Sequence, residues 1–204
     1  QLGARIEAGD GLTMHNIVFL MNGAKRPRGG ELLTLSLIRN LRRDLFTPIL
    51  ICGRESAEAE QLSREGVRTF KIAVDDRAAA LYLREIGLKN SWRTLNSAYR
   101  LARSRTVSAV SEILKESRAD LVYCADSLSK LIGGIAARRF GIKAVGHCHD
   151  DLRNYRFGYP LRLLNLLLLH KIVAVSDAVY EAFGSKSGIS SKAVMIHNGV
   201  DTNR

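Results

Sequence analysis

The hydrophobic pattern of the chain alternates between short apolar runs and longer stretches in which apolar and polar residues mix. The apolar runs are rich in Val, Ile and Leu and have the length of β-strands, and such near-continuous hydrophobicity is typical of strands buried on both faces. They cover residues 16–21, 48–52, 67–72, 120–124, 142–147, 171–175 and 193–196. The pattern therefore predicts a set of buried strands spread over the whole chain.

Between the apolar runs, apolar side chains recur every three or four residues, as they do on one face of an α-helix. In residues 31–43 this spacing ends at two arginines, which suit the negative end of a helix. The longest such pattern runs from Trp92 to Ile113 and predicts one continuous helix, whereas residues 75–89 give only a weak signal for a short one. The remaining helices are predicted at residues 55–65, 127–140, 160–169 and 177–183.

Strict alternation of strand and helix predicts an α/β fold, with a Rossmann-like, doubly wound parallel sheet of about seven strands. The chain has 204 residues, which suits a single domain. We assign that domain to residues 14–204 and treat residues 1–13, rich in Gly and Ala, as an extension or a remnant of expression. No apolar run reaches the length that a membrane-spanning helix needs.

The net charge is the unusual feature of the composition. The chain has 31 Lys and Arg residues against 20 Asp and Glu, a formal net charge of +11. Such a charge indicates an anionic partner, for example a membrane surface, a phosphorylated substrate or nucleic acid, although a solvated basic surface explains it equally well. The three cysteines, Cys52, Cys124 and Cys148, lack the spacing of metal ligands. This favours reduced thiols in a cytosolic protein and argues against a zinc site.

The loop between the first strand and its helix, residues 22–30, contains a Gly-Gly pair and several basic residues. The backbone amides of Gly29 and Gly30, with the positive end of the following helix, can approach a phosphate. A tight turn with positive φ angles is the alternative reason for the pair. The dinucleotide motif Gly-x-Gly-x-x-Gly and the Gly-Lys-Ser motif of NTPases are both absent, which argues against dehydrogenases and kinases.

His149 stands at the end of the fifth apolar run, where it reaches the carboxyl edge of the predicted sheet and is followed by Asp150. Open α/β sheets bind their ligands at this edge. His147 is the competing candidate, because alternate side chains of a strand point to the same face. We prefer His149 since it lies nearer the edge, and we expect substitution of His147 to affect mainly stability. A structural role in the core is the simpler alternative for a lone histidine.

Three short motifs follow one another in the second half of the chain. They are His149-Asp150 after the fifth strand, Val175-Ser176 before a helix, and the turn Asn198 to Asp201, which reads Asn-Gly-Val-Asp. In this order they resemble the amino-terminal half of glycosyltransferase family 4, whose members are retaining, two-domain sugar transferases of the GT-B fold. The resemblance covers roughly residues 14–204. Taken singly, Ser176 is also a helix N-cap and Asn-Gly is a turn in any protein.

The resemblance implies roles for several of these residues. His149 would lie between the donor sugar and the acceptor and hydrogen-bond the reacting sugar. Gly29 and Gly30 would contact the diphosphate of the donor, and Glu31 would contact the acceptor. The family loop usually reads Gly-Gly-x-Glu or Gly-Gly-x-Gln, and here Arg28 stands where its first glycine belongs. Which glycine faces the phosphate therefore stays open.

A basic and aromatic rim is expected around the acceptor. Side chains of this kind can hold an anionic or lipid-linked molecule, and a merely solvated face is the equal alternative. The rim would consist of Lys25, Arg26, Arg28, Arg153, Arg156 and Arg162 with Tyr155, Phe157 and Tyr159. Our candidate acceptor-binding residues are Glu31, Lys25, Arg28, Asp150, Arg153 and Tyr155.

The resemblance implies that the chain is the acceptor-binding half of a retaining, hexosyltransferase-like enzyme. The enzyme would transfer a sugar from a nucleotide-sugar to a glycan, lipid-linked or small-molecule acceptor, with no cofactor and no required metal. A carboxyl-terminal donor-binding domain would complete it, so this half alone should fold but be inactive. We expect a cytoplasmic protein with peripheral contact to the inner, anionic face of the membrane, and no nucleic-acid partner. The alternatives are a sugar-nucleotide epimerase of the same two-domain fold and a non-catalytic basic docking module.

Overall fold

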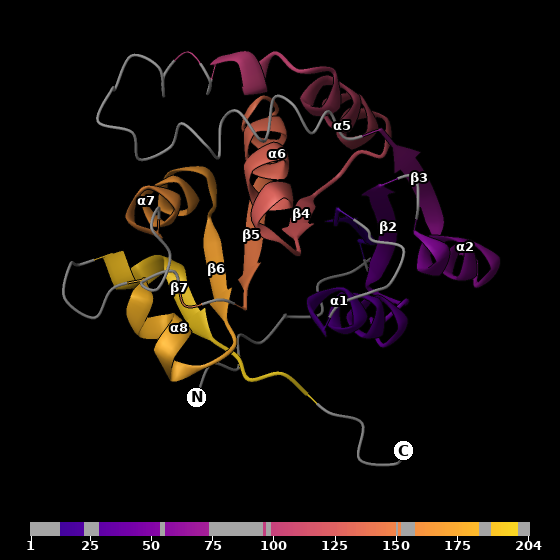
Figure 1. Cartoon of the computed structure of the whole chain (residues 1–204). Helices are drawn as coiled ribbons and strands as arrows, with labels where there is room; N and C mark the ends of the chain where they lie inside the picture. Colours follow the sequence, from indigo (N-terminus) through magenta and orange to yellow (C-terminus); the bar gives the residue numbers. More distant parts are fainter. Residues whose placement is uncertain are drawn as a thin grey trace.

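The computed structural model describes residues 13–22, 29–53, 56–73, 96, 99–149, 151, 158–183 and 189–199. Its strands form one parallel sheet in the order β3-β2-β1-β4-β5-β6-β7 (Figure 1). They are β1 (His15–Leu20), β2 (Phe46–Gly53), β3 (Arg68–Ile72), β4 (Leu121–Cys124), β5 (Lys143–Cys148), β6 (Lys171–Ala174) and β7 (Ala193–Met195). Each predicted strand is present within two residues of its expected bounds, so the predicted fold class is confirmed.

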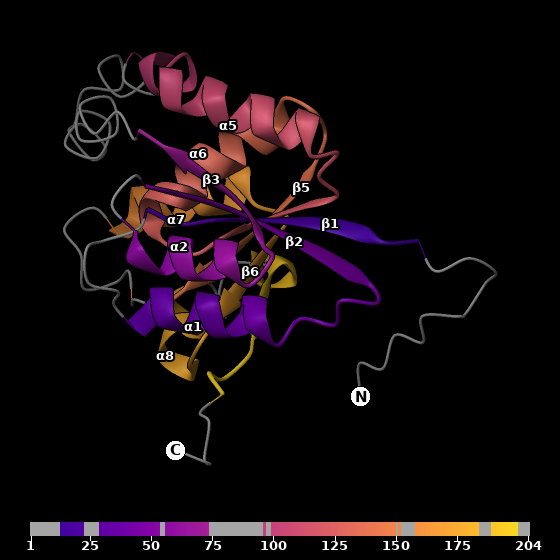
Figure 2. The same cartoon turned by 90° about the vertical axis from the view of Figure 1, so that its right-hand side faces the viewer.

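Helices cover both faces of this sheet (Figure 2). The two on one face are α1 (Gly29–Arg39) and α2 (Ala57–Arg64). The other face carries α5 (Arg105–Glu116), α6 (Ser127–Arg138), α7 (Gly158–Leu168) and α8 (Asp177–Ala182), and a short 3-10 helix, η2 (Ile189–Lys192), precedes β7. None of the described helices is both long and apolar enough to cross a bilayer.

The hydrophobic core lies in two layers because side chains of a strand alternate between its faces. On β1, Val18 and Leu20 pack toward α5 and α6, while Ile17 and Phe19 pack toward α1 and α2. Val18 is completely buried and Phe19 is 1% exposed, so both faces of this strand are inaccessible to water. Burial on both faces explains why the sequence of the central strands is a continuous apolar run and not an alternating one.

Helix α6 lies unusually close to the sheet. A Cβ atom added at Gly133 would lie 2.7 Å from Cys124 Sγ, and one added at Gly134 would lie 2.8 Å from Leu168 Cβ. Any larger side chain would therefore push α6 away from β4 or from α7. The small residues of α6 thus permit its close approach to the sheet.

The continuous helix predicted from Trp92 to Ile113 is wrong at Ser104. This residue is extended, with φ −67° and ψ 153°, and its hydroxyl accepts a hydrogen bond of 3.2 Å from the amide of Val107. Ser104 is thus the N-cap of α5, and the helical turn before it ends separately. Trp92 and the short helix predicted at residues 75–89 lie outside the described residues.

Candidate functional site

The order of the strands reverses between β1 and β4, which are neighbours in the parallel sheet although β2 and β3 lie between them in sequence. The helix after β1 packs on one face of the sheet, and the helix after β4 packs on the other. A crevice opens at such a point, outside the carboxyl ends of the strands, and it is where open α/β sheets bind ligands. Asn22, Asp126 and His149 follow β1, β4 and β5 at this edge.

Asp126 fixes the backbone on both sides of the crevice. One carboxylate oxygen accepts hydrogen bonds from the amides of Leu128 and Ser129, at 2.9 and 2.8 Å, and completes a capping box at the start of α6. The other accepts a 2.8 Å hydrogen bond from the amide of Asn22. The residues that leave β1 toward α1 are thereby tied to α6. Sequence reasoning missed this residue, although the Asp-x-x-Ser pattern before an apolar stretch is a recognisable cap signal.

Gly29 and Gly30 form the first turn of α1 and are not part of a loop, which corrects the prediction from sequence. Neither glycine has a positive φ angle, so the alternative of a tight turn is also wrong. A Cβ atom at Gly30 would lie 3.0 Å from Nε2 and 3.1 Å from Cδ2 of His149, whereas one at Gly29 would meet no atom within 4 Å. The glycine at position 30 is therefore explained by its contact with the His149 ring.

His147 in β5 and His149 directly after the strand point to the same side of the sheet, as predicted from strand alternation. Their ring centroids are 4.3 Å apart. His147 is only 6% exposed and its Nδ1 shares a hydrogen bond with the hydroxyl of Tyr123 on β4, while His149 lies nearer the edge and is partly exposed. The more accessible position belongs to the residue that we preferred from sequence, and its role in the reaction stays a prediction.

Burial determines the protonation states of His147 and Tyr123. It lowers the pKa of His147 to about 4, with a further contribution from the charges of His149 and Lys130. Burial also raises the pKa of the Tyr123 hydroxyl above its ordinary range. Near neutral pH the structure thus contains a neutral His147 imidazole bonded to a protonated Tyr123 phenol.

Lys130 holds the end of β5 from the opposite face of the sheet. Its ammonium group donates to the carbonyl oxygen of His147 at 3.1 Å and lies 3.3 Å from Cys148 Sγ. The side chain is 4% exposed and passes over Gly146, where a Cβ atom would lie 2.9 Å from Lys130 Cδ. The backbone that carries His149 is therefore fixed from both faces. A buried lysine in α6 was not predicted from the sequence, since lysines are rarely buried.

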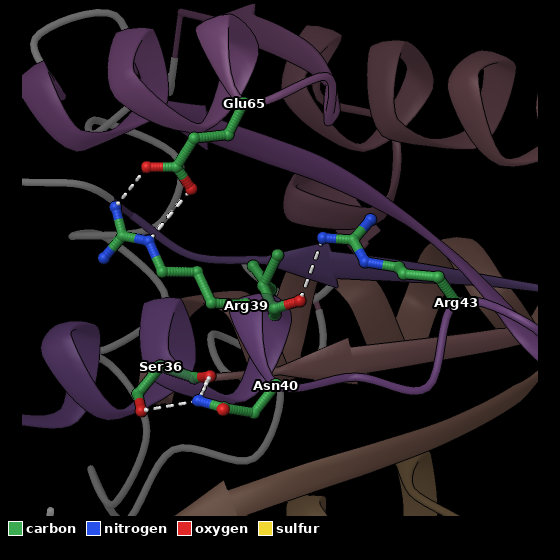
Figure 3. A network of polar contacts seen from close by, with 6 residues as sticks. Ser36, Arg39, Asn40, Arg43 and Glu65 are labelled. Atoms are coloured by element: carbon green, nitrogen blue, oxygen red, sulfur yellow. Dashed lines mark hydrogen bonds and ion pairs between the residues drawn. The ribbon is translucent and has the colours of Figure 1, made fainter.

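A groove of about 640 Å³ runs beside His147, between α1 and the segment that follows β7. One side of α1 forms its wall, and Figure 3 shows Ser36 and Asn40 on that side while Arg39 turns the other way to Glu65 of α2. A volume of this size suits a small organic ligand. The groove is lined by Leu33, Ser36, Leu37, Asn40, Tyr123, His147, Val173, Ile196, His197, Asn198 and Gly199.

Only some of the remaining predicted site residues lie in the described part of the chain. Glu31 lies in the first turn of α1, and Ser176 caps α8 by accepting a 3.4 Å hydrogen bond from the amide of Val179. Arg162, predicted for the basic rim, donates instead to the carbonyl oxygen of Ala182 at 2.9 Å and so joins α7 to α8. The candidates Lys25, Arg28, Asp150, Arg153 and Tyr155 lie outside the described residues.

The described residues also allow two other kinds of chemistry to be assessed, reactive cysteines and a metal site. Cys52, Cys124 and Cys148 are buried and are not joined in disulfides. Burial raises the pKa of the Cys52 thiol to about 11, so it keeps its proton near neutral pH. Among the described residues no group of three or more His, Cys, Asp or Glu side chains is arranged to hold a metal ion.

Solved structures with the same fold include a protein in complex with UDP and glucose, a galactosyltransferase and an epimerase. HepE of Anabaena, in complex with UDP and glucose, is 20% identical with a TM-score of 0.66, over 92% of this chain and 45% of that one. The lipopolysaccharide outer core galactosyltransferase WaaB is 15% identical with a TM-score of 0.62, over 91% and 46%. A UDP-N-acetylglucosamine 2-epimerase is 10% identical with a TM-score of 0.55, over 91% and 49%.

The chain thus spans about half the length of the solved structures that it matches. No curated protein sequence is similar enough to match it. The sequence profile of Glycosyltransferase Family 4 matches residues 27–204, which include α1, the crevice and all strands from β2 to β7. Its parallel sheet has the Rossmann-like fold of the GT-B neighbours, and by the profile match the chain belongs to Glycosyltransferase Family 4.

Proposed function

We propose that the chain is the acceptor-binding half of a retaining glycosyltransferase that moves a sugar from a nucleotide-sugar to an acceptor. The observation that carries the proposal is the contact between His149 and the first turn of α1. It brings a polar ring and the amino end of a helix to one point of the carboxyl edge of the sheet, where nucleotide ligands of such folds bind. The structures of HepE with UDP and with UDP-glucose support a nucleotide-sugar as the donor.

The first turn of α1 suits the diphosphate of that donor. The amides at the amino end of a helix have no partner within the helix, and the helix dipole adds positive potential there. Gly29 is exposed, and no atom of the described residues lies within 4 Å of the position that a side chain would occupy. A phosphate can therefore approach its backbone closely, and no cofactor or metal is required for this contact.

His149 suits the sugar that is transferred. A retaining transfer develops positive charge on the sugar ring and negative charge on the departing diphosphate, so it needs positioned groups for both. The imidazole of His149 can hydrogen-bond the sugar while the α1 amides bind the diphosphate beside it. The groove that His147 lines is our candidate for the acceptor site, and a second domain would supply the remaining donor contacts.

The test is to substitute His149 in the complete enzyme and to follow labelled nucleotide-sugars. We expect His149→Ala to lower kcat by on the order of a hundredfold, the usual loss for one positioned polar group. His15→Ala is the matched control, because His15 lies at the amino edge of the sheet with a side chain 54% exposed. Wild-type turnover in His149→Ala would refute the role of this residue.

A sugar-nucleotide epimerase is the second candidate, and the likeness to a UDP-N-acetylglucosamine 2-epimerase over 91% of the chain supports it. The same experiment separates the two functions by product. A transferase attaches the labelled sugar to an acceptor or releases it to water, whereas an epimerase returns a nucleotide-sugar with one inverted centre. Accumulation of the epimer without transfer would favour the second candidate.

A further inference from the structure

The proposed function uses His149 but leaves two buried polar side chains beside it without a role. Tyr123 is 8% exposed and His147 is 6% exposed, and they are joined by a hydrogen bond between the phenol oxygen and Nδ1. The Tyr123 ring meets the His147 ring edge-on at 5.8 Å, and the His147 ring lies 4.3 Å from that of His149. The three rings thus form one row from β4 to the edge of the sheet.

The row ends at α1. On one side the His149 ring contacts His147, and on the other its Nε2 and Cδ2 lie 3.0 and 3.1 Å from where a Cβ atom of Gly30 would be. These contacts from two directions limit how far the ring can turn. Because the backbone of β5 is also held by Lys130, the orientation of His149 depends on whether His147 keeps its own place.

The hydrogen bond to Tyr123 decides the orientation and the tautomer of His147. A phenol is a stronger acid than a neutral imidazole, and an imidazole nitrogen is a better acceptor than a phenol oxygen, so the hydroxyl donates to Nδ1. The proton of the neutral ring then lies on Nε2, for which the described residues provide no hydrogen-bond partner. An unpaired buried donor lowers stability, and two apolar side chains would fill the same space without this cost. Packing alone therefore does not explain the presence of Tyr123 and His147.

We propose that Tyr123 and His147 are positioning residues for His149: the Tyr123 hydroxyl locks the His147 ring, and the locked ring holds His149 against the first turn of α1. The proposal rests on the proposed function of His149 and adds how that side chain is kept in place. Neither inner residue needs to touch the substrate. Their effect on the reaction is through the geometry of His149, where an error of about an ångström can cost a large part of the rate.

The first test reads the tautomer directly in the complete enzyme, with nitrogen-15 labelled histidine and NMR. We expect His147 to carry its proton on Nε2 and to present an unprotonated Nδ1. In Tyr123→Phe, which keeps the ring and removes the hydroxyl, that preference should weaken and the ring resonances of His149 should shift. A proton on Nδ1 of His147 in the wild-type protein, or unchanged His149 resonances in Tyr123→Phe, would overturn the proposal.

The second test is kinetic. Tyr123→Phe should lower kcat on the order of tenfold while the KM for the nucleotide-sugar changes less than about twofold, because the binding groups stay in place and only their alignment is lost. The control is Tyr99→Phe, which removes a hydroxyl from a side chain 60% exposed and outside the row, and which should behave as the wild type. Equal kcat values for the two variants would contradict a positioning role.

A third variant separates positioning from packing. His147→Gln keeps an acceptor for the Tyr123 hydroxyl but lacks the ring that contacts His149, so it should lose kcat to a similar extent, in place of the mainly structural effect that we expected from the sequence. If Tyr123 and His147 act as one unit, the double variant should lose little more than either single variant. Independent, multiplying losses would overturn the proposal. If His149→Ala itself is fully active, the proposed function fails; if only His149→Ala is impaired, the positioning role alone fails.

Discussion

At the scale of single residues, Gly30 is the position in the candidate site where the His149 ring leaves no room for a side chain. Replacement by alanine would place a methyl group 3.0 Å from His149 Nε2, so the ring must move by a few tenths of an ångström. We expect Gly30→Ala to lower kcat by about tenfold or more, because a misaligned catalytic group loses much of its effect. Stability should change little, since alanine also favours the helix by up to about 1 kcal/mol.

Gly29→Ala is the matched control for this prediction. It is the same substitution one residue earlier in the same turn, it keeps the backbone amide, and its methyl group meets no atom within 4 Å. Its effect on kcat should therefore be clearly smaller than that of Gly30→Ala. Steady-state kinetics of both variants, with thermal melting to confirm folding, make the comparison. Equal losses would show that the His149 contact is not the reason for the glycine.

His147 should make the stability of the protein depend on pH. Burial lowers its pKa to about 4 from the ordinary 6.5. The unfolded chain therefore takes up this proton more readily than the folded protein. The stability that comes from neutral His147 is fully present above pH 6.5, falls as the pH drops toward 4, and reaches a constant loss below that. The total decrease in the free energy of unfolding should be about 3 kcal/mol.

Urea unfolding above pH 6.5 and near pH 4 measures this effect in the wild type and in His147→Gln. Other groups titrate in both proteins, so the prediction concerns the difference between them: the variant should lose less stability on acidification by about 2 to 3 kcal/mol. His15→Gln, at an exposed position, should follow the wild type. An identical pH dependence for all three proteins would mean that His147 is not buried as a neutral ring.

At the scale of elements, the central strands could be predicted because residues buried on both faces of a strand form a continuous apolar run. The helix from Trp92 to Ile113 could not, since periodicity is summed over a window and does not detect a single extended residue. Thr106, Val110 and Ile113 are buried as the pattern requires, yet Ser104 starts a new helix in front of them. Its tendency to cap a helix prevails over the continuous stripe.

The same distinction applies to the site. The contact between His149 and Gly30 could be anticipated from the sequence. Both residues follow predicted strands, so both lie at the carboxyl edge of the sheet, near the point where the strand order reverses. The hydrogen bond from Tyr123 to His147 depends on strand register, because Tyr123 pairs with Val145 and reaches His147 two residues further along the same face. The register between β4 and β5 is a property of the folded sheet and cannot be predicted from the sequence of either strand alone.

At the scale of the whole molecule, the charge of +11 remains without a partner in the described structure. Several acidic side chains are already paired at the surface, for example Glu65 with Arg39, Glu60 with Lys71 and Asp44 with Arg42. Such exposed pairs contribute little stability, and each uses one cation and one carboxylate, so the basic excess of the chain is unchanged by them. The surplus cations are therefore available for an anionic surface, as the sequence led us to expect for a membrane.

We predict that the chain binds vesicles containing an anionic lipid more strongly than neutral ones. Each basic residue near such a surface contributes about 1 kcal/mol, and the attraction is screened within about 10 Å at 0.1 M salt and about 3 Å at 1 M. Sedimentation with the two kinds of vesicle at low and high salt measures this, and high salt should release the protein. Changing Lys25, Arg28 and Arg153 together to Glu should abolish binding if the expected rim makes the contact, whereas the same three changes at Lys143, Lys171 and Arg138 should only weaken it. Equal sedimentation with both kinds of vesicle, or equally strong binding to duplex DNA, would show that the charge does not serve a membrane.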